Sequence, residues 1–115
     1  MSLYGNDTLY RQDVALMDLL ASQCSDMEAV LGLARRETLA AEKGDFREMV
    51  AVAQERAALH ERLESCYRRI AEVRAFMGSA AEPAIRGAIA ERALKLTIDI
   101  ETQDARTTSL MICRR

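Results

Sequence analysis

The chain has 115 residues, and 18 acidic against 16 basic side chains give it a formal net charge of −2. These charges are interspersed and form no basic stripe, which argues against nucleic-acid binding. No apolar run approaches the ~20 residues of a membrane-spanning helix, and the N-terminus lacks the pattern of a secretory signal. The three cysteines form no CxxC pair and are typical of reduced thiols in a cytoplasmic protein. We therefore expect a single cytoplasmic domain over residues 1–115.

The composition favours helices over sheets. Hydrophobic residues make up 50% of the chain, yet aromatics are only 4%, Trp is absent and Pro83 is the one proline. Chains rich in Ala, Leu, Met, Glu and Arg form long helices or coiled coils. We predict an all-α fold, a coiled-coil-like antiparallel three-helix bundle made of a long helical hairpin plus a third helix. The helices are expected at about residues 8–43, 46–77 and 83–112.

The first predicted helix begins at an N-cap, Asp7 or Thr8. Its apolar residues recur at steps of three and four, with a gap near Asp13. This seam consists of Leu9, Leu16, Leu20, Cys24, Met27, Leu31, Ala34, Thr38 and Ala41. Leu19 and Val30 widen the apolar face on one side, and Met17 widens it on the other. A face this broad usually contacts two neighbouring helices.

The segment around Gly44 contains a helix stop followed at once by a helix start. Gly44 can end a helix in a left-handed turn without a side-chain penalty. Asp45 is a preferred N-cap residue, and Glu48 three positions later completes the spacing of a capping box. With only these two residues between them, the flanking helices are expected to fold back as a long antiparallel hairpin.

The second predicted helix carries a further apolar seam with one basic interruption. The seam consists of Met49, Val52, Leu59, Leu63, Cys66, Ile70, Val73 and Met77. Arg56 occupies the gap, where its stem can pack while its head reaches water. His60, the only histidine, lies beside the seam without a cluster of His, Cys or carboxylate partners. We interpret it as a packed or half-exposed helical residue.

The third predicted helix has two apolar faces. Pro83 suits its first turn, and an inward seam follows: Ile85, Ile89, Ala93, Leu96, Ile100, Thr107 and Leu110. A second stripe lies about 180° from Leu96 at 100° per residue; it consists of Gly87, Leu94, Ile98, Ala105 and Ile112. This stripe could be scattered exposed aliphatics, or it could be covered if the third helix were central. We predict instead that Leu94, Ile98, Ala105 and Ile112 contact a partner helix or a second copy.

The sequence shows no arrangement typical of catalysis. The five glycines are isolated, so no phosphate-binding loop is present, and one histidine supports neither a triad nor a Glu-x-x-His di-metal motif. We expect no catalytic residue, no cofactor and no metal site. The remote enzyme alternative is a fold similar to the helical chorismate mutases, which bind a dicarboxylate with several basic residues inside a bundle. Here Arg56 is the only inward basic candidate.

The hairpin resembles the flagellar type III export chaperones of the FlgN/FliT kind. The resemblance rests on residues 33–37 (LARRE) and 40–46 (AAEKGDF), and it continues through Met49, Val52, residues 55–56 and Leu59 to Leu63. It covers about 30 residues in detail and the rest only by its architecture. Residues 103–109 (QDARTTS) depart from the Asn-rich segment often seen in the FlgN-type chaperones, so the branch and the client stay open.

The resemblance implies a cytoplasmic protein that is not an enzyme. Such a chaperone would bind the helical end of a flagellar export substrate, a hook-filament junction or cap protein. It would prevent premature assembly and deliver the client to the export apparatus. The resemblance places client binding on the third helix. The alternative function is a homo-oligomeric coiled-coil adaptor that uses the same stripe to form a homodimer.

Overall fold

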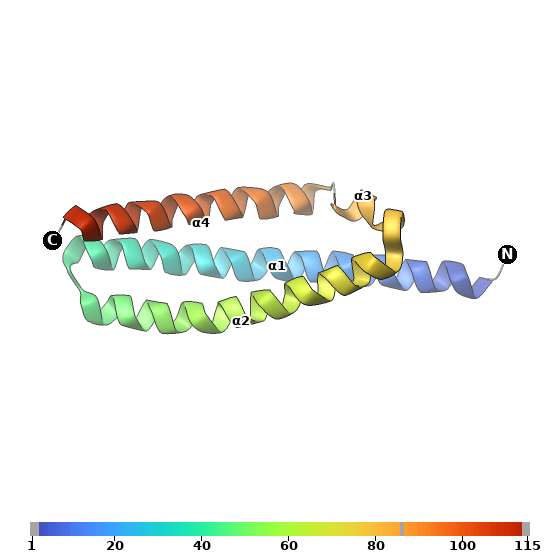
Figure 1. The fold of residues 1–115 in the computed structure, drawn as a ribbon, viewed down its shortest axis with the longest axis horizontal. Helices are drawn as coiled ribbons and strands as arrows, with labels where there is room; N and C mark the ends of the chain where they lie inside the picture. Colours follow the sequence, from blue (N-terminus) through green and yellow to red (C-terminus); the bar gives the residue numbers. More distant parts are fainter. Residues whose placement is uncertain (1–2, 86, 114–115) are drawn as a thin grey trace.

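The computed structural model describes residues 3–85 and 87–113, and the side chains of these residues except 3–9 and 84. Three long helices dominate the described chain, α1 (Leu3–Lys43), α2 (Phe46–Met77) and α4 (Ala88–Cys113). A 3-10 turn, η1 (Gly78–Ala81), and the one-turn helix α3 (Glu82–Ile85) connect α2 to α4 (Figure 1). No strand occurs in the described ranges, and the all-α three-helix fold is confirmed.

Two of the expected helix boundaries are wrong. The first helix begins at Leu3 and passes through positions 7 and 8, so neither Asp7 nor Thr8 caps it. The third helix is not continuous over 83–112, because α3 ends at Ile85 and α4 begins at Ala88. The carbonyl of Gly87 accepts the N–H groups of Ala90 and Glu91 at 3.0 and 3.2 Å. Gly87 is therefore the N-cap of α4, a position that glycine tolerates better than a helix interior.

The α1–α2 turn is a Schellman motif followed by an N-cap. Gly44 has a φ of 68°, and its N–H donates to the carbonyl of Ala41 at 3.2 Å. The N–H of Asp45 donates to the carbonyl of Ala40 at 2.8 Å. The Asp45 carboxylate accepts the N–H of Glu48 at 3.1 Å, so the predicted cap forms. The reciprocal half of the capping box does not, since the N–H of Asp45 is already bonded to α1.

The long helix α1 lies between the other two. It packs antiparallel against α2 and parallel to α4, and both neighbours pack on α1 rather than on each other (Figure 1). The broad face predicted for the first helix therefore does contact two helices. The idea that the third helix is central and covered on both sides is wrong. The molecule measures 67 × 22 × 16 Å, an elongated three-helix bundle in which α1 is the middle helix of a layer.

The core changes character along the layer. Near α3, large residues from α1 and α2 pack together with Ala81 and Ile85, including Leu16, Leu20, Ile70 and Met77. A second cluster in the middle of the layer consists of Cys24, Met27, Val30, Leu31, Leu63 and Leu96. Burying side chains of this size contributes roughly 1.5–3 kcal/mol each. Together the two clusters hold both α2 and α4 on α1.

Towards Gly44 the α1–α4 contact is small and polar. Thr38 and Thr107 are buried, and their hydroxyl oxygens lie 2.8 Å apart. The Thr38 hydroxyl is also 3.0 Å from the side-chain oxygen of Gln103. Hydrogen-bonded buried hydroxyls are not costly, whereas unpaired ones are. This contact therefore favours one register of α4 on α1.

Within the described ranges, no helix combines the length and the apolar character that crossing a bilayer requires.

Candidate functional site: a groove between α2 and α4

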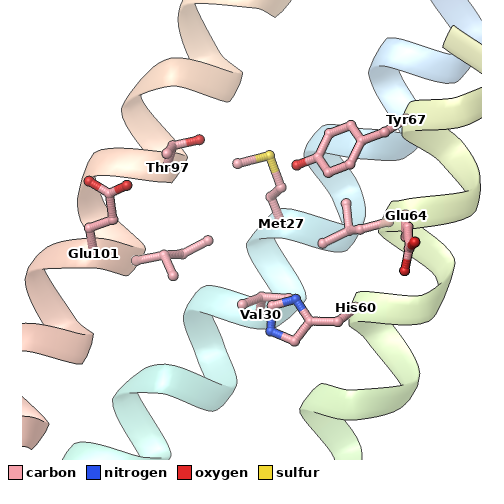
Figure 2. A pocket seen from close by; sticks show the side chains of 9 residues that line it. Met27, Val30, His60, Glu64, Tyr67, Thr97 and Glu101 are labelled. Carbon is pink, nitrogen blue, oxygen red and sulfur yellow. The ribbon is translucent and has the colours of Figure 1, made fainter. Parts of the chain in front are cut away.

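An open groove runs where α2 and α4 diverge above α1. Met27 and Val30 of α1 form its floor, and its volume is about 440 Å³. The walls come from α2 and α4, and Figure 2 shows their side chains facing one another across the floor. The α2 wall consists of His60, Leu63, Glu64 and Tyr67, and the α4 wall consists of Thr97, Ile100 and Glu101. A partner that enters the groove therefore contacts all three long helices.

The bottom of the groove is apolar. Met27, Val30 and Leu63 belong to the middle core cluster, and Ile100 packs against that cluster while only half-buried. Tyr67 is 46% exposed at the upper edge of the α2 wall. Apolar surface that is reachable from solvent in a concave site is the usual character of a binding groove.

The edges of the groove are acidic. Glu64 on α2 and Glu101 on α4 are exposed and lie on opposite sides of the floor (Figure 2). The lining, all within the described part of the chain, contains these two carboxylates and neither Lys nor Arg. The groove therefore presents negative charge on both edges and apolar surface between them.

An ion pair outside the groove lining joins α2 to α4. Arg56 Nη1 and Nη2 donate to the two carboxylate oxygens of Asp104 at 2.8 and 3.1 Å. Glu37 of α1 lies 3.8 Å from Arg56 Nη1. The bond to Asp104, followed by the charges of Asp104 and Glu37, raises the pKa of Arg56 against the opposing effect of burial. The guanidinium is thus neutralised within the protein, not directed at water as we expected.

The predicted partner-binding residues lie outside this groove. Leu94, Ile98 and Ile112 are 62%, 53% and 62% exposed on α4, and Ala105 on the same stripe is also exposed. The stripe faces away from α1, whereas Thr97 and Glu101 of the same helix line the groove. The structure therefore brings none of these four residues into the concave site, and their contact with a partner stays a prediction.

Sequence reasoning missed the groove itself. Its lining mixes seam residues such as Leu63 with His60, which we placed only beside the seam. The one sequence signal was the breadth of the α1 face, which requires two neighbours but does not say how far apart they stand.

The groove has no metal-binding character. Among the described residues, no group of three or more His, Cys, Asp or Glu side chains could hold an ion. The histidine and the two glutamates of the lining come from two helices on opposite sides of the floor.

No protein-family model matches the chain, and neither a curated protein nor a solved structure matches it at a significant level.

Proposed function

We propose that this protein binds an amphipathic helix of another protein in the α2–α4 groove. The observation that carries the proposal is a groove with a largely apolar lining, in which Tyr67 and Ile100 remain partly exposed, between two helices that pack mainly on α1. A helix laid there becomes the fourth member of a four-helix bundle and buries the exposed apolar part of this lining. Seating the apolar face of a helix in a hydrophobic groove is a common mode of peptide recognition.

The resemblance of the hairpin to FlgN/FliT-type chaperones suggests the biological setting. In that setting the protein is a cytoplasmic, non-enzymatic export chaperone. Its client is the helical segment of a flagellar export substrate, a hook-filament junction or cap protein. Occupying the apolar face of that segment keeps the client from assembling before export. The export apparatus would be the second partner.

Two threonines of α4 offer a matched test of the groove. Thr97 and Thr102 are both exposed, and each hydroxyl donates to the carbonyl four residues earlier, at 2.9 and 2.8 Å. Only Thr97 lines the groove. Thr97→Trp fills the groove and should weaken binding of a client helix at least tenfold by titration calorimetry, whereas Thr102→Trp should not. Equal affinities of the two variants would contradict binding in the groove.

The homo-oligomeric adaptor is the second candidate, favoured by the exposed stripe of Leu94 and Ile98 on α4. Light scattering of the purified chain, alone and with a client helix, separates the two functions. If the stripe forms a homodimer, Leu94→Glu combined with Ile98→Glu should yield monomers. A dimer that survives both substitutions would remove the stripe as its interface.

An enzyme similar to chorismate mutase is not supported by the groove. Such an enzyme needs basic groups around an anionic dicarboxylate, and the lining carries two carboxylates instead. Arg56 is already engaged by Asp104. We expect no turnover of chorismate, and turnover that Arg56→Ala abolishes would reinstate the enzyme.

A further inference from the structure

The two glutamates at the edges of the groove, Glu64 and Glu101, do not take part in the ion pairs that join the helices. The carboxylates that join α1 to α2 or α4 through ion pairs each contact an arginine, as Glu48 contacts Arg36 and Glu42 contacts Arg106. Glu64 and Glu101 have no such partner within the described chain. These two carboxylates are therefore available to a molecule that enters the groove.

A helix in the groove would place its flanking residues at these edges. When the apolar face of a helix packs between two others, the residues bordering that face approach the charged residues of its neighbours, as at the e and g positions of coiled coils. Here the neighbours are Glu64 on one side and Glu101 on the other. Basic residues on both borders would form ion pairs, and acidic residues would be repelled.

We propose that the groove selects an amphipathic helix, from a partner protein, that carries Lys or Arg on both borders of its apolar face. This inference rests on the proposed function and adds the charge pattern of the partner. Charge sets specificity and association rate more than total affinity. The apolar lining therefore provides most of the affinity, and the two glutamates discriminate among client helices.

A second copy of the chain fits this groove less well. In the described part of α4, the exposed aliphatic stripe is bordered by Lys95 on one side and by Glu101 on the other. If that helix lay in the groove, the carboxylate on one of its borders would face a carboxylate at the edge of the groove. Like charges across a contact disfavour the wrong partner. A partner helix with two basic borders has no such conflict.

The test uses three synthetic helical peptides of about 20 residues, long enough to form a helix. They share one leucine face and differ only in the bordering residues, which are all Lys, all Gln or all Glu. Fluorescence anisotropy with the full chain measures their affinities. The Lys peptide would gain two partly exposed ion pairs, whereas the Glu peptide would meet two repulsions. We therefore predict that the Lys peptide binds about tenfold more tightly than the Glu peptide. Added salt should reduce this ratio.

Charge reversal locates the effect in the groove. Glu64→Lys combined with Glu101→Lys should invert the order of the Lys and Glu peptides. The matched control is Glu72→Lys combined with Glu91→Lys, which changes the net charge equally at exposed positions of α2 and α4 outside the lining. The control should preserve the order, although with a smaller ratio because the whole molecule is more positive.

The outcomes separate this inference from the proposed function. Binding of all three peptides with equal affinity, or an equal response of the two double variants, overturns the charge selection and leaves helix binding intact. Failure of all three peptides to bind overturns both. A homodimer in light scattering that the Lys peptide cannot dissociate, and that Thr97→Trp does dissociate, identifies a second copy as the occupant and overturns the inference.

Discussion

Arg56 links the three long helices at a single point. Its side chain is only 14% exposed, and it reaches Asp104 of α4 and Glu37 of α1 from α2. Because α2 and α4 pack mainly on α1, this ion pair is an important direct connection between them. Removing one member of a buried pair leaves the other charge desolvated, which destabilises a protein more than the pair itself contributes.

Arg56→Met should therefore lower the free energy of unfolding by about 1–2 kcal/mol. This value is smaller than the loss expected for a fully buried ion pair, because the Asp104 side chain is 40% exposed. Urea denaturation measures the change. Arg36→Met is the control, since Arg36 forms two ion pairs at the exposed surface of α1 and α2 and should matter much less. The double variant Arg56→Met with Asp104→Leu should regain part of the loss. Equal losses for the two arginines would show that burial is irrelevant here.

Cys66 makes stability depend on pH in the alkaline range. Its thiol is buried and lies 3.3 Å from the carbonyl of Leu19, to which it donates. Burial, followed by the charge of Asp26, raises its pKa above the ordinary value of 9.0, and Arg69 opposes this shift. A raised pKa means that the folded protein holds the proton after the unfolded chain has released it. Stability from this group is complete below pH 9.0 and is lost as the pH rises through the raised pKa.

The stability difference between the wild type and Cys66→Ala should accordingly shrink when the pH is raised from 8 to above 9.0. Chemical denaturation at each pH measures this difference, so other titrating groups cancel. Cys113→Ala removes an exposed thiol outside the core and serves as the control. A difference that stays constant, or grows, over this pH range would contradict the assignment to Cys66.

Single residues also mark the limit of prediction from this sequence. The gap that Arg56 fills in the α2 seam was visible, because helical periodicity is local. Its partner Asp104 was not, because the two are 48 positions apart and nothing local specifies which helices meet. The cap at Asp45 could be predicted in advance, since the Asp45 carboxylate and the Glu48 N–H that donates to it lie within one turn.

At the scale of elements, the α1–α2 turn depends on one backbone conformation. Gly44 has a φ of 68°, a backbone conformation that residues with a side chain adopt only with strain. Gly32, by contrast, is an exposed residue within α1, and a Cβ added there meets no atom within 4 Å. The same substitution should therefore have opposite effects at the two sites.

Gly44→Ala should destabilise the protein by about 1–2 kcal/mol, and Gly32→Ala should stabilise it by about 0.5–1 kcal/mol through the lost flexibility of the unfolded chain. Thermal unfolding of the two variants against the wild type measures both changes. Two shifts of the same sign would mean that the turn is not held in the left-handed conformation. Neither substitution touches the groove lining, so both variants should retain helix binding.

The ends of the helices were harder to predict than their faces. The seams of α1, α2 and α4 follow from apolar spacing, and most of their members are buried or half-buried. The position where α1 starts and the break at Gly87 depend on small differences in the free energy of the terminal turns of each helix. A single glycine within a helical pattern is often tolerated, so the pattern alone did not place the N-cap of α4.

At the scale of the molecule, the groove is a consequence of topology. The sequence indicates how wide the apolar face of each helix is, but the distance between α2 and α4 depends on how both pack on α1. Here the two neighbours stand far enough apart to leave a groove above Met27 and Val30, with Tyr67 and Ile100 of its walls partly exposed. The candidate site could thus be recognised only once the three helices were placed together.

The overall shape provides a test that needs no knowledge of the client. The radius of gyration is 18.2 Å, whereas a compact domain of this length would have about 13 Å. A helix that binds in the groove lies beside α1 along the length of the layer, so it adds mass without extending the long axis of 67 Å.

We therefore expect X-ray scattering to give a radius of gyration close to 18.2 Å for the free chain. It should change little on binding of the helical peptide with lysine borders, while the forward scattering rises in proportion to the added mass. The matched measurement uses Thr97→Trp, for which the forward scattering should not rise at the same peptide concentration. A radius that increases clearly with the mass would place the peptide at an end of the molecule, for example at the projecting N-terminal part of α1 (Figure 1), and not in the groove.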